Sequence, residues 1–233
     1  MILEYLKWYD VLILTVIMFG PAIILSFSAV TAESHEEGLP KENLKESEEF
    51  SSKENWWALG TQVIQLCIAI GYLFLRNFNF SRWNFDIGLK EIGLSILLFF
   101  LCGLIMDFLM SLNIGFDWIP KTIKSSIPIV DAFQQANVST AVYSFFNGFY
   151  EELFFLGIAL AIEPKFLVVG FIYSLVVRIL FHTYQGLWTA VTMGLDLGLV
   201  YFLLYANVND NLLIFAIAHG IADLLGLSFV NIL

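Results

Sequence analysis

Two adjacent carboxylates, Glu151 and Glu152, lie inside an apolar stretch that covers about 138–162. A stretch of that length suits a helix that crosses a membrane. An acid near the centre of a bilayer costs at least about 2.5 kcal/mol on insertion scales, so each acid needs a partner or a chemical task. A carboxylate can take a proton from water as a general base, and we therefore expect the pair to carry chemistry.

Polar residues spaced four apart recur in three apolar stretches. Residues at this spacing share one face of a helix, so each stretch presents a polar pair on a single face. We expect the three faces to meet in one polar site. The pairs are Asn147 with Glu151, Arg178 with His182, and His219 with Asp223. Because His182 falls near the end of its stretch, we expect the cavity to open toward that end.

These residue types fit more than one chemistry. Glu151, His182 and His219 are suitable zinc ligands, although the sequence lacks a HExxH spacing on one helix. Ser174 lies on the same face as Arg178 but has no GxSxG context, which disfavours a serine nucleophile. Asp196 lies between Gly194 and Gly198, and its pattern predicts close packing but no defined role.

The elements that must position these residues belong to a membrane protein. Of the 233 residues, 59% are hydrophobic and 14% are charged, and the mean hydropathy is +0.80. These values lie outside the usual range of soluble domains. The net charge of -10 argues against binding to nucleic acid. Cys67 and Cys102 both fall in apolar runs, which predicts small core residues and no disulfide.

Seven apolar stretches are spaced as transmembrane helices, which predicts an all-α, polytopic bundle in a single membrane domain over 1–233. Glu163-Pro164-Lys165 and Tyr184-Gln185-Gly186 are expected turns between successive helices. The predicted helices cover about 11–29, 56–75, 92–112 and 138–162, then a stretch that ends at 182, then 187–205, and a last one after a turn at 207–211.

Two polar segments interrupt the apolar pattern. Residues 31–55 hold eight Glu against three Lys and are expected to form a solvated loop, with attraction of a basic peptide as the alternative. Residues 117–131 are too polar and too rich in proline to cross a membrane. We expect the first span to be retained rather than cleaved as a signal peptide, and the grouping of Arg76, Arg82 and Lys90 favours a cytoplasmic N-terminus.

The order of these motifs resembles the CPBP family of intramembrane proteases, the CAAX protease and bacteriocin-processing proteins formerly called Abi. The resemblance covers about 146–226 within a motif-bearing core of 138–226. It rests on Glu151-Glu152 followed by Gly157, then Arg178 and His182 leading into the turn at 184–186, then His219 with Asp223.

Two positions depart from the family pattern. The first motif of the family is Glu-Glu-x-x-x-Arg, and Leu156 stands where the arginine belongs. The second is usually Phe-x-x-x-His, and Arg178 stands at the phenylalanine position. We therefore predict that Arg178, from a neighbouring helix, supplies the counter-charge to Glu152 that residue 156 no longer provides.

The resemblance implies an endopeptidase that hydrolyses a peptide bond near the membrane. In this role Glu151 activates water, Glu152 shares the work as base or anchor, His182 and His219 polarise the carbonyl or hold the water, and Asp223 orients His219. Arg178 and Asn147 support the site. The expected substrate is a peptide or protein, in bacteriocin or peptide processing or self-immunity. No cofactor is required, and zinc remains an alternative.

The expected location is a bacterial cell membrane, with the chain as a multi-pass integral protein in contact with the lipid bilayer. Two other functions fit the same residues. A catalytically silent relative would act by binding, as an immunity or regulatory protein, and Leu156 is its best support. A proton-coupled transporter would use the same acids and histidines as relays, but paired broken helices and inverted repeats are not apparent.

Overall fold

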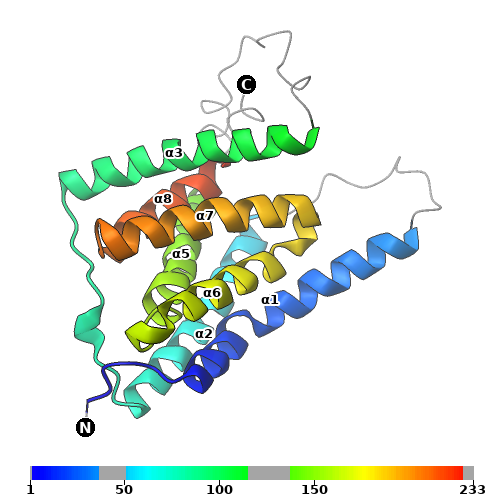
Figure 1. The fold of residues 1–233 in the computed structure, drawn as a ribbon. Coiled ribbons are helices and arrows are strands. Elements are labelled where there is room, and N and C mark those ends of the chain that lie inside the picture. The colour runs from blue at the N-terminus through cyan, green and yellow to red at the C-terminus, as the bar shows by residue number, and fades with distance from the viewer. Residues whose placement is uncertain (1, 37–50, 115–136, 228–233) are drawn as a thin grey trace.

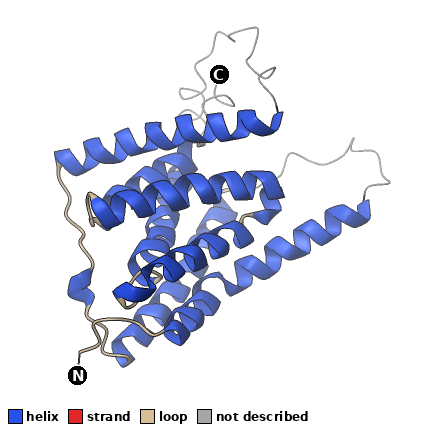
Figure 2. Cartoon of the chain, viewed as in Figure 1, coloured by secondary structure: helices blue, strands red, loops and turns tan. Residues whose placement is uncertain are grey.

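The computed structural model of the chain describes residues 2–36, 51–114 and 137–227. These ranges contain seven α-helices and no β-strand (Figures 1 and 2). The predicted all-α architecture is confirmed. The α-helices are α1 (Trp8–Glu36), α2 (Ser52–Leu75), α3 (Leu89–Ile114), α5 (Val138–Glu152), α6 (Leu167–Phe181), α7 (Leu187–Asn207) and α8 (Leu212–Leu225).

Five of these helices are long and apolar enough to cross a membrane, namely α1, α2, α3, α7 and α6 together with its leading 3-10 turn η5 (Pro164–Phe166). α5 continues without a break into η4 (Leu153–Ile158), a turn of π-helix. α8 has 14 residues, which at 1.5 Å per residue gives about 21 Å, shorter than the hydrocarbon core of about 30 Å. The chain is thus an integral membrane bundle whose last helix is shorter than expected.

Several helix ends are fixed by local sequence. Asn137 begins α5, and its side chain accepts a hydrogen bond from the Thr140 amide at 3.0 Å. Asn211 caps the start of α8 in the same way, because its side chain accepts a hydrogen bond of 3.1 Å from the Leu213 amide. The predicted turn at 184–186 is present as η6 (Thr183–Gln185), which ends at Gly186 with φ of 95°. A positive φ of this kind favours glycine.

The two polar segments fall largely outside the described residues. α1 continues to Glu36, beyond the expected end at 29, so the first residues of the predicted acidic loop are helical. The rest of that loop up to residue 50, and all of 117–131, lie outside the described ranges. α2 begins at Ser52, with Ser51 as its N-cap.

Neighbouring helices form a closed ring in the order α1, α6, α7, α3, α8, α5 and α2, with α2 returning to α1. Figure 1 shows one side of this ring, where α1, α6, α7 and α3 follow one another. The π-helical η4 contacts α5, α6, α7 and α8, and all of its residues are buried. The ring therefore encloses the segment that follows Glu152.

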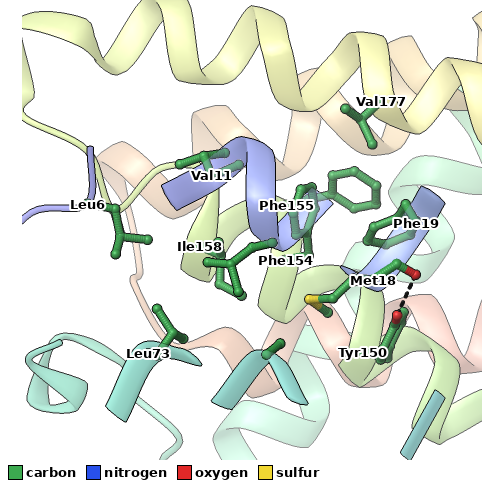
Figure 3. Packing of buried hydrophobic residues seen from close by; sticks show 14 of the residues in the cluster. Leu6, Val11, Met18, Phe19, Leu73, Tyr150, Phe154, Phe155, Ile158 and Val177 are labelled. Carbon is green, nitrogen blue, oxygen red and sulfur yellow. Dashed lines mark hydrogen bonds between the residues drawn. The ribbon is translucent and has the colours of Figure 1, made fainter. Parts of the chain in front are cut away.

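Aromatic and aliphatic side chains fill the ring on the α1 side. Figure 3 shows Phe19 of α1 against Phe154 and Phe155 of η4, with ring centroids 4.8 and 5.2 Å apart. The Tyr150 hydroxyl donates a hydrogen bond of 2.6 Å to the Met18 carbonyl. This bond and the aromatic cluster hold α1 against the helix that carries the acidic pair.

Short backbone contacts gather the connections at one end of the bundle. The Leu6 amide donates to the Ala161 carbonyl at 2.7 Å, and Leu3 pairs with Phe78. At this end Glu163 forms salt bridges with Lys7 at 3.0 Å and with Lys165 at 2.7 Å. The N-terminal segment, the end of α2 and the η5 turn are thereby tied together.

Candidate active site

α5 and α8 cross at two glycines directly beside the acidic pair. A Cβ added to Gly148 would lie 2.6 Å from the Ala216 carbonyl oxygen and 2.6 Å from the Gly220 nitrogen. A Cβ added to Gly220 would lie 2.8 Å from the Phe145 Cα. Distances under 3.0 Å leave no room for a methyl group, so only glycine permits this crossing. The close approach brings His219 of α8 to the carboxylates of α5.

Glu152 is bonded through both of its oxygens. Arg178 Nη2 donates to Oε1 and to Oε2, each at 2.9 Å, and His219 Nδ1 lies 2.6 Å from Oε1. The side chains of Glu152, Arg178 and His219 are at most 1% exposed. The predicted ion pair between Arg178 and Glu152 is therefore present. A buried carboxylate with a cation and an imidazole as partners is fixed in place.

Arg178 is enclosed on all sides. Its guanidinium carbon lies 4.0 Å from the centroid of the Phe155 ring, a distance suited to a cation–π contact. Nε and Nη1 have no hydrogen-bond partner among the described residues. Arginine is seldom fully buried unless it is paired, so the contact with Glu152 accounts for its position in the core.

Glu151 is bonded on one side only. Asn147 Nδ2 donates to Oε1 at 2.9 Å, as the spacing of four residues predicts. Oε2 is buried and has no hydrogen-bond partner within the described ranges. The nearest imidazole nitrogen, His219 Nε2, lies 3.7 Å away, which is too long for a hydrogen bond. One oxygen of Glu151 is thus oriented, and the other is available.

Asp223 completes the same cluster from α8. Asn147 Nδ2 donates to Asp223 Oδ2 at 2.7 Å, and His219 Nε2 lies 3.5 Å from Asp223 Oδ1. The contact of His219 Nδ1 with Glu152 is much shorter. Glu152 therefore holds the imidazole more firmly than Asp223, the residue that the sequence assigned to that role. The Asp223 side chain is 27% exposed, so this side of the cluster is open.

His182 lies at the edge of the cluster. It follows the last residue of α6, and its Nδ1 is 2.8 Å from the Arg178 carbonyl oxygen. It is near enough to His219 and Asp223 to interact electrostatically, but no hydrogen bond or ion pair joins it to either residue in the described ranges. The ring stacks beside Tyr184, with centroids 6.5 Å apart. The structure thus brings His182 to the rim of the cluster.

Three residues that the sequence singled out make no hydrogen bond to either acid among the described residues. Leu156, at the position of the family arginine, is buried in an apolar cluster with Leu98, Leu153 and Leu212. Asp196 of α7 is 1% exposed and lies close enough to the Cys102 thiol and to Arg178 to interact with both. Ser174 donates to the Phe155 carbonyl at 3.3 Å, which is a structural contact within the core.

Glu151, His182 and His219 are the residues of the cluster that could serve as metal ligands. No group of three His, Cys, Asp or Glu side chains in the described ranges is arranged to hold a metal ion. Glu152 is bound to Arg178, whereas His182 and His219 each direct Nδ1 to an oxygen, an orientation that metal-bound histidines also have. In the described residues, however, Glu151, His182 and His219 are not gathered around one point as the ligands of a bound ion would be. Cys67 and Cys102 are both free thiols.

One residue of the cluster escaped the sequence reasoning. Gln62 of α2 donates through Nε2 to Asn147 Oδ1 at 2.6 Å. Its signal was present, because Gln62 and Gln65 are the only amide side chains between residues 56 and 75, where an apolar span was expected. A glutamine in such a span calls for a partner on another helix.

Comparison with known proteins identifies the second half of the chain. Residues 133–225 match the family model described as Type II CAAX prenyl endopeptidase Rce1-like. This segment contains all three polar pairs, and the resemblance to the CPBP proteases is confirmed there. No curated protein and no solved structure matches the chain.

Proposed function

We propose, on the premise that residues 133–225 are Rce1-like, that this chain is an intramembrane endopeptidase in which Glu151 activates the attacking water. The family supports a membrane protease of the CAAX type. The observation that carries the catalytic assignment is the difference between the two acids. Glu152 has both oxygens occupied by Arg178 and His219, whereas Glu151 Oε2 has no hydrogen-bond partner in the part of the chain that the structure describes.

The roles of the other residues follow from their contacts. A water beside Glu151 Oε2 also lies within reach of His219 Nε2, because those two atoms are 3.7 Å apart. Glu151 takes a proton from this water as the water oxygen bonds to the carbonyl carbon of the substrate. The proton then passes to the amide nitrogen as the carbon–nitrogen bond breaks. His182 at the rim and His219 are the candidates that polarise the carbonyl oxygen.

Asn147 and Asp223 orient this arrangement, and Glu152 with Arg178 forms its fixed anchor. Glu152 already has fixed partners at its oxygens, Arg178 at both and His219 at Oε1. We therefore assign the role of general base to Glu151 and the role of a fixed structural anchor to Glu152. No step in this mechanism requires a metal ion.

The substrate class follows from the family and from the position of the cluster. The family name specifies a prenylated substrate, and the Asp223 side chain, which is 27% exposed, is the part of the cluster that faces outward. We assign to the chain a peptide or protein whose scissile bond lies near the membrane surface. Bacteriocin or peptide processing, or self-immunity, in a bacterial cell membrane is the setting that the motif pattern favours.

Cleavage by the purified full chain in lipid vesicles tests this function. The probes are a quenched fluorescent peptide ending in S-farnesylcysteine and three further residues, and the same peptide without the farnesyl group. We expect cleavage of at least one probe, resistance of that activity to a zinc chelator, and loss of activity in Glu151→Ala. Equal activity in Glu151→Ala would refute the mechanism, and loss on chelation would favour a metal enzyme.

The rival function is binding without catalysis, as in an immunity or regulatory protein. Leu156 favours it, because a buried leucine replaces the arginine of the family motif. This rival predicts that Glu151→Gln and His219→Gln variants fold and keep their protective or binding effect in cells. Loss of that effect in Glu151→Gln, with normal expression, would exclude the rival.

A further inference from the structure

We propose that Gln62 of α2 is a positioning residue that orients Asn147 and, through it, Glu151. The catalytic importance of Gln62 rests on the proposed function, whereas its hydrogen bond to Asn147 does not depend on that function. Gln62 lies outside the segment that matches the protease family. The site would then extend beyond the three motifs to a helix from the first half of the chain.

The Asn147 side chain has a complete set of hydrogen bonds. Its Nδ2 donates to Glu151 Oε1 at 2.9 Å and to Asp223 Oδ2 at 2.7 Å, which uses both amide hydrogens. Its Oδ1 accepts from Gln62 Nε2 at 2.6 Å. Each polar atom of the amide thus has a partner, and the three partners come from α2, α5 and α8.

The chemistry of the partners allows only one orientation of the Asn147 amide. Ionised carboxylates accept hydrogen bonds and cannot donate them, so the NH2 group must face Glu151 and Asp223. Rotation of the amide by half a turn would place Oδ1 against two carboxylate oxygens. Gln62 stabilises the correct orientation, because its Nε2 is a donor and matches only the carbonyl oxygen of Asn147.

Stability alone does not explain this glutamine. Gln62 Oε1 is buried and has no hydrogen-bond partner among the described residues, and an unpartnered buried acceptor is costly. A methionine of similar length would remove that acceptor, but it would also leave Asn147 Oδ1 without its donor. The amide is therefore better explained by what its donor does for Asn147 than by its contribution to folding.

Gln65, one turn further along α2, provides a matched comparison. Its Oε1 lies 3.0 Å from the Tyr150 hydroxyl, which itself donates to the Met18 carbonyl. Both glutamines are partly buried, and both contact α5. Only Gln62 reaches a residue that touches the acids. Substitution of the two positions separates positioning of the site from packing of α2 on α5.

The first measurement needs no substrate. Dicyclohexylcarbodiimide modifies carboxyl groups inside membrane proteins, and fragmentation by mass spectrometry distinguishes Glu151 from Glu152. We expect Gln62→Met to label severalfold faster at Glu151 than the natural chain, because a carboxyl whose amide partner turns freely reaches the reagent more often. We expect Gln65→Met to label at the natural rate.

A second variant tests whether Gln62 acts through Asn147. Residues that act in one network have non-additive effects. The double variant Gln62→Met with Asn147→Leu is expected to label no faster than Asn147→Leu alone. Labelling that multiplies the two separate effects, or a Gln62→Met rate equal to the natural one, would overturn the proposal. Thermal unfolding of each variant in vesicles shows whether the helices remain assembled.

Measurement of peptide cleavage shows whether the loss of the Gln62 amide also lowers catalytic activity. With the farnesylated probe peptide, Gln62→Met should lower kcat by about tenfold to about hundredfold with little change in KM, as expected for small misplacements of a catalytic group. Gln65→Met should leave kcat unchanged. Failure of the natural chain to cleave either probe would count against the proposed protease, whereas the labelling comparison would still decide the role of Gln62. An unchanged kcat in Gln62→Met would refute a catalytic consequence.

Discussion

Glu151 and Glu152 are neighbours in the chain, yet they occupy two different regions of the site. The Glu152 side is made by Arg178 and His219, and its carboxylate has a partner at each oxygen. The Glu151 side is made by Asn147 and Asp223, and one oxygen of Glu151 has no hydrogen-bond partner within residues 2–36, 51–114 and 137–227. The difference teaches that one acid supports the structure, while the other has the freedom that a general base requires.

The largest expected effect comes from removing the available oxygen. Glu151→Gln keeps the volume and the contact position but abolishes the basic carboxylate, so kcat should fall by about 10²-fold to 10⁴-fold. The folded protein should remain as stable as the natural chain, because Glu151 Oε2 has no partner to lose. Peptide cleavage and thermal unfolding measured on one preparation check both statements. A strongly destabilised Glu151→Gln would show that the two regions are not distinct.

The next effect concerns the cation of the Glu152 side. Arg178→Leu leaves a buried carboxylate without its counter-charge, which should cost about 3–5 kcal/mol in free energy of unfolding. Denaturation in mild detergent, followed by the fluorescence of the six tryptophans, measures this cost. Combining Arg178→Leu with Glu152→Gln should restore part of the stability, because the variant no longer buries an unpaired charge.

Moving the arginine from position 178 to position 156 provides the control for this prediction. The double variant Arg178→Phe with Leu156→Arg places the arginine and phenylalanine as in the family motifs that the chain resembles. It should be more active than Arg178→Phe alone. Leu156→Arg alone should destabilise the bundle, since residue 156 lies in an apolar cluster and is 4% exposed. Equal behaviour of all three variants would refute the idea that Arg178 replaces the family arginine.

A smaller effect is expected at the crossing that joins the two regions. Gly148→Ala places a methyl group 2.6 Å from backbone atoms of α8, and such overpacking costs about 1–3 kcal/mol. The displacement of α8 should move His219 away from both acids, so activity should fall more than stability does. Gly60→Ala is the matched control, because nothing lies within 4 Å of a Cβ at that position. An active Gly148→Ala would show that the crossing distance does not set the site.

The smallest effect belongs to a carboxylate outside the membrane-spanning helices. Lys165 and Lys7 hold the pKa of Glu163 below its usual value through hydrogen bonds. A lowered pKa in the folded state adds stability above the unfolded value, and this stability is lost as pH falls through the folded pKa. Glu163→Gln should therefore remove a small part of the acid-side pH dependence of unfolding. Because exposed pairs are weak, a change as large as that of Arg178→Leu would contradict the contrast between surface and buried ion pairs.

Much of the fold was predictable because membrane helices are long and apolar. The stretches that the sequence marked as helices correspond to helices in the described ranges, and the turns at 163–165 and 184–186 are present. The turn before α8 was predicted, but the short length of α8 was not, since the apolar sequence continues past Gly226, which ends the helix. The π-helical turn after Glu152 was also missed, because it depends on packing inside the ring rather than on local sequence.

Within the candidate site, the spacing of four residues correctly placed Asn147 beside Glu151, and the exchanged arginine correctly predicted the pair of Arg178 with Glu152. Spacing along one helix carries no information about the contacts between helices. For that reason it did not reveal that Glu152 makes the shorter contact with His219, nor that Gln62 joins the cluster from α2.

The π-helical turn from Leu153 to Ile158 has a consequence for how the length of this chain can vary. A π-turn holds one residue more than an α-turn, and one residue of an α-helix corresponds to a rotation of about 100°. Deleting a single residue here would close the turn into ordinary α-helix and leave the acidic pair facing α6 and α8, whereas a deletion within α5 would rotate residues on one side of it by about 100°. The segment from Leu153 to Ile158 can therefore change in length by one position more easily than α5 can, and a gap aligned there would not by itself mark a protein that lacks the site.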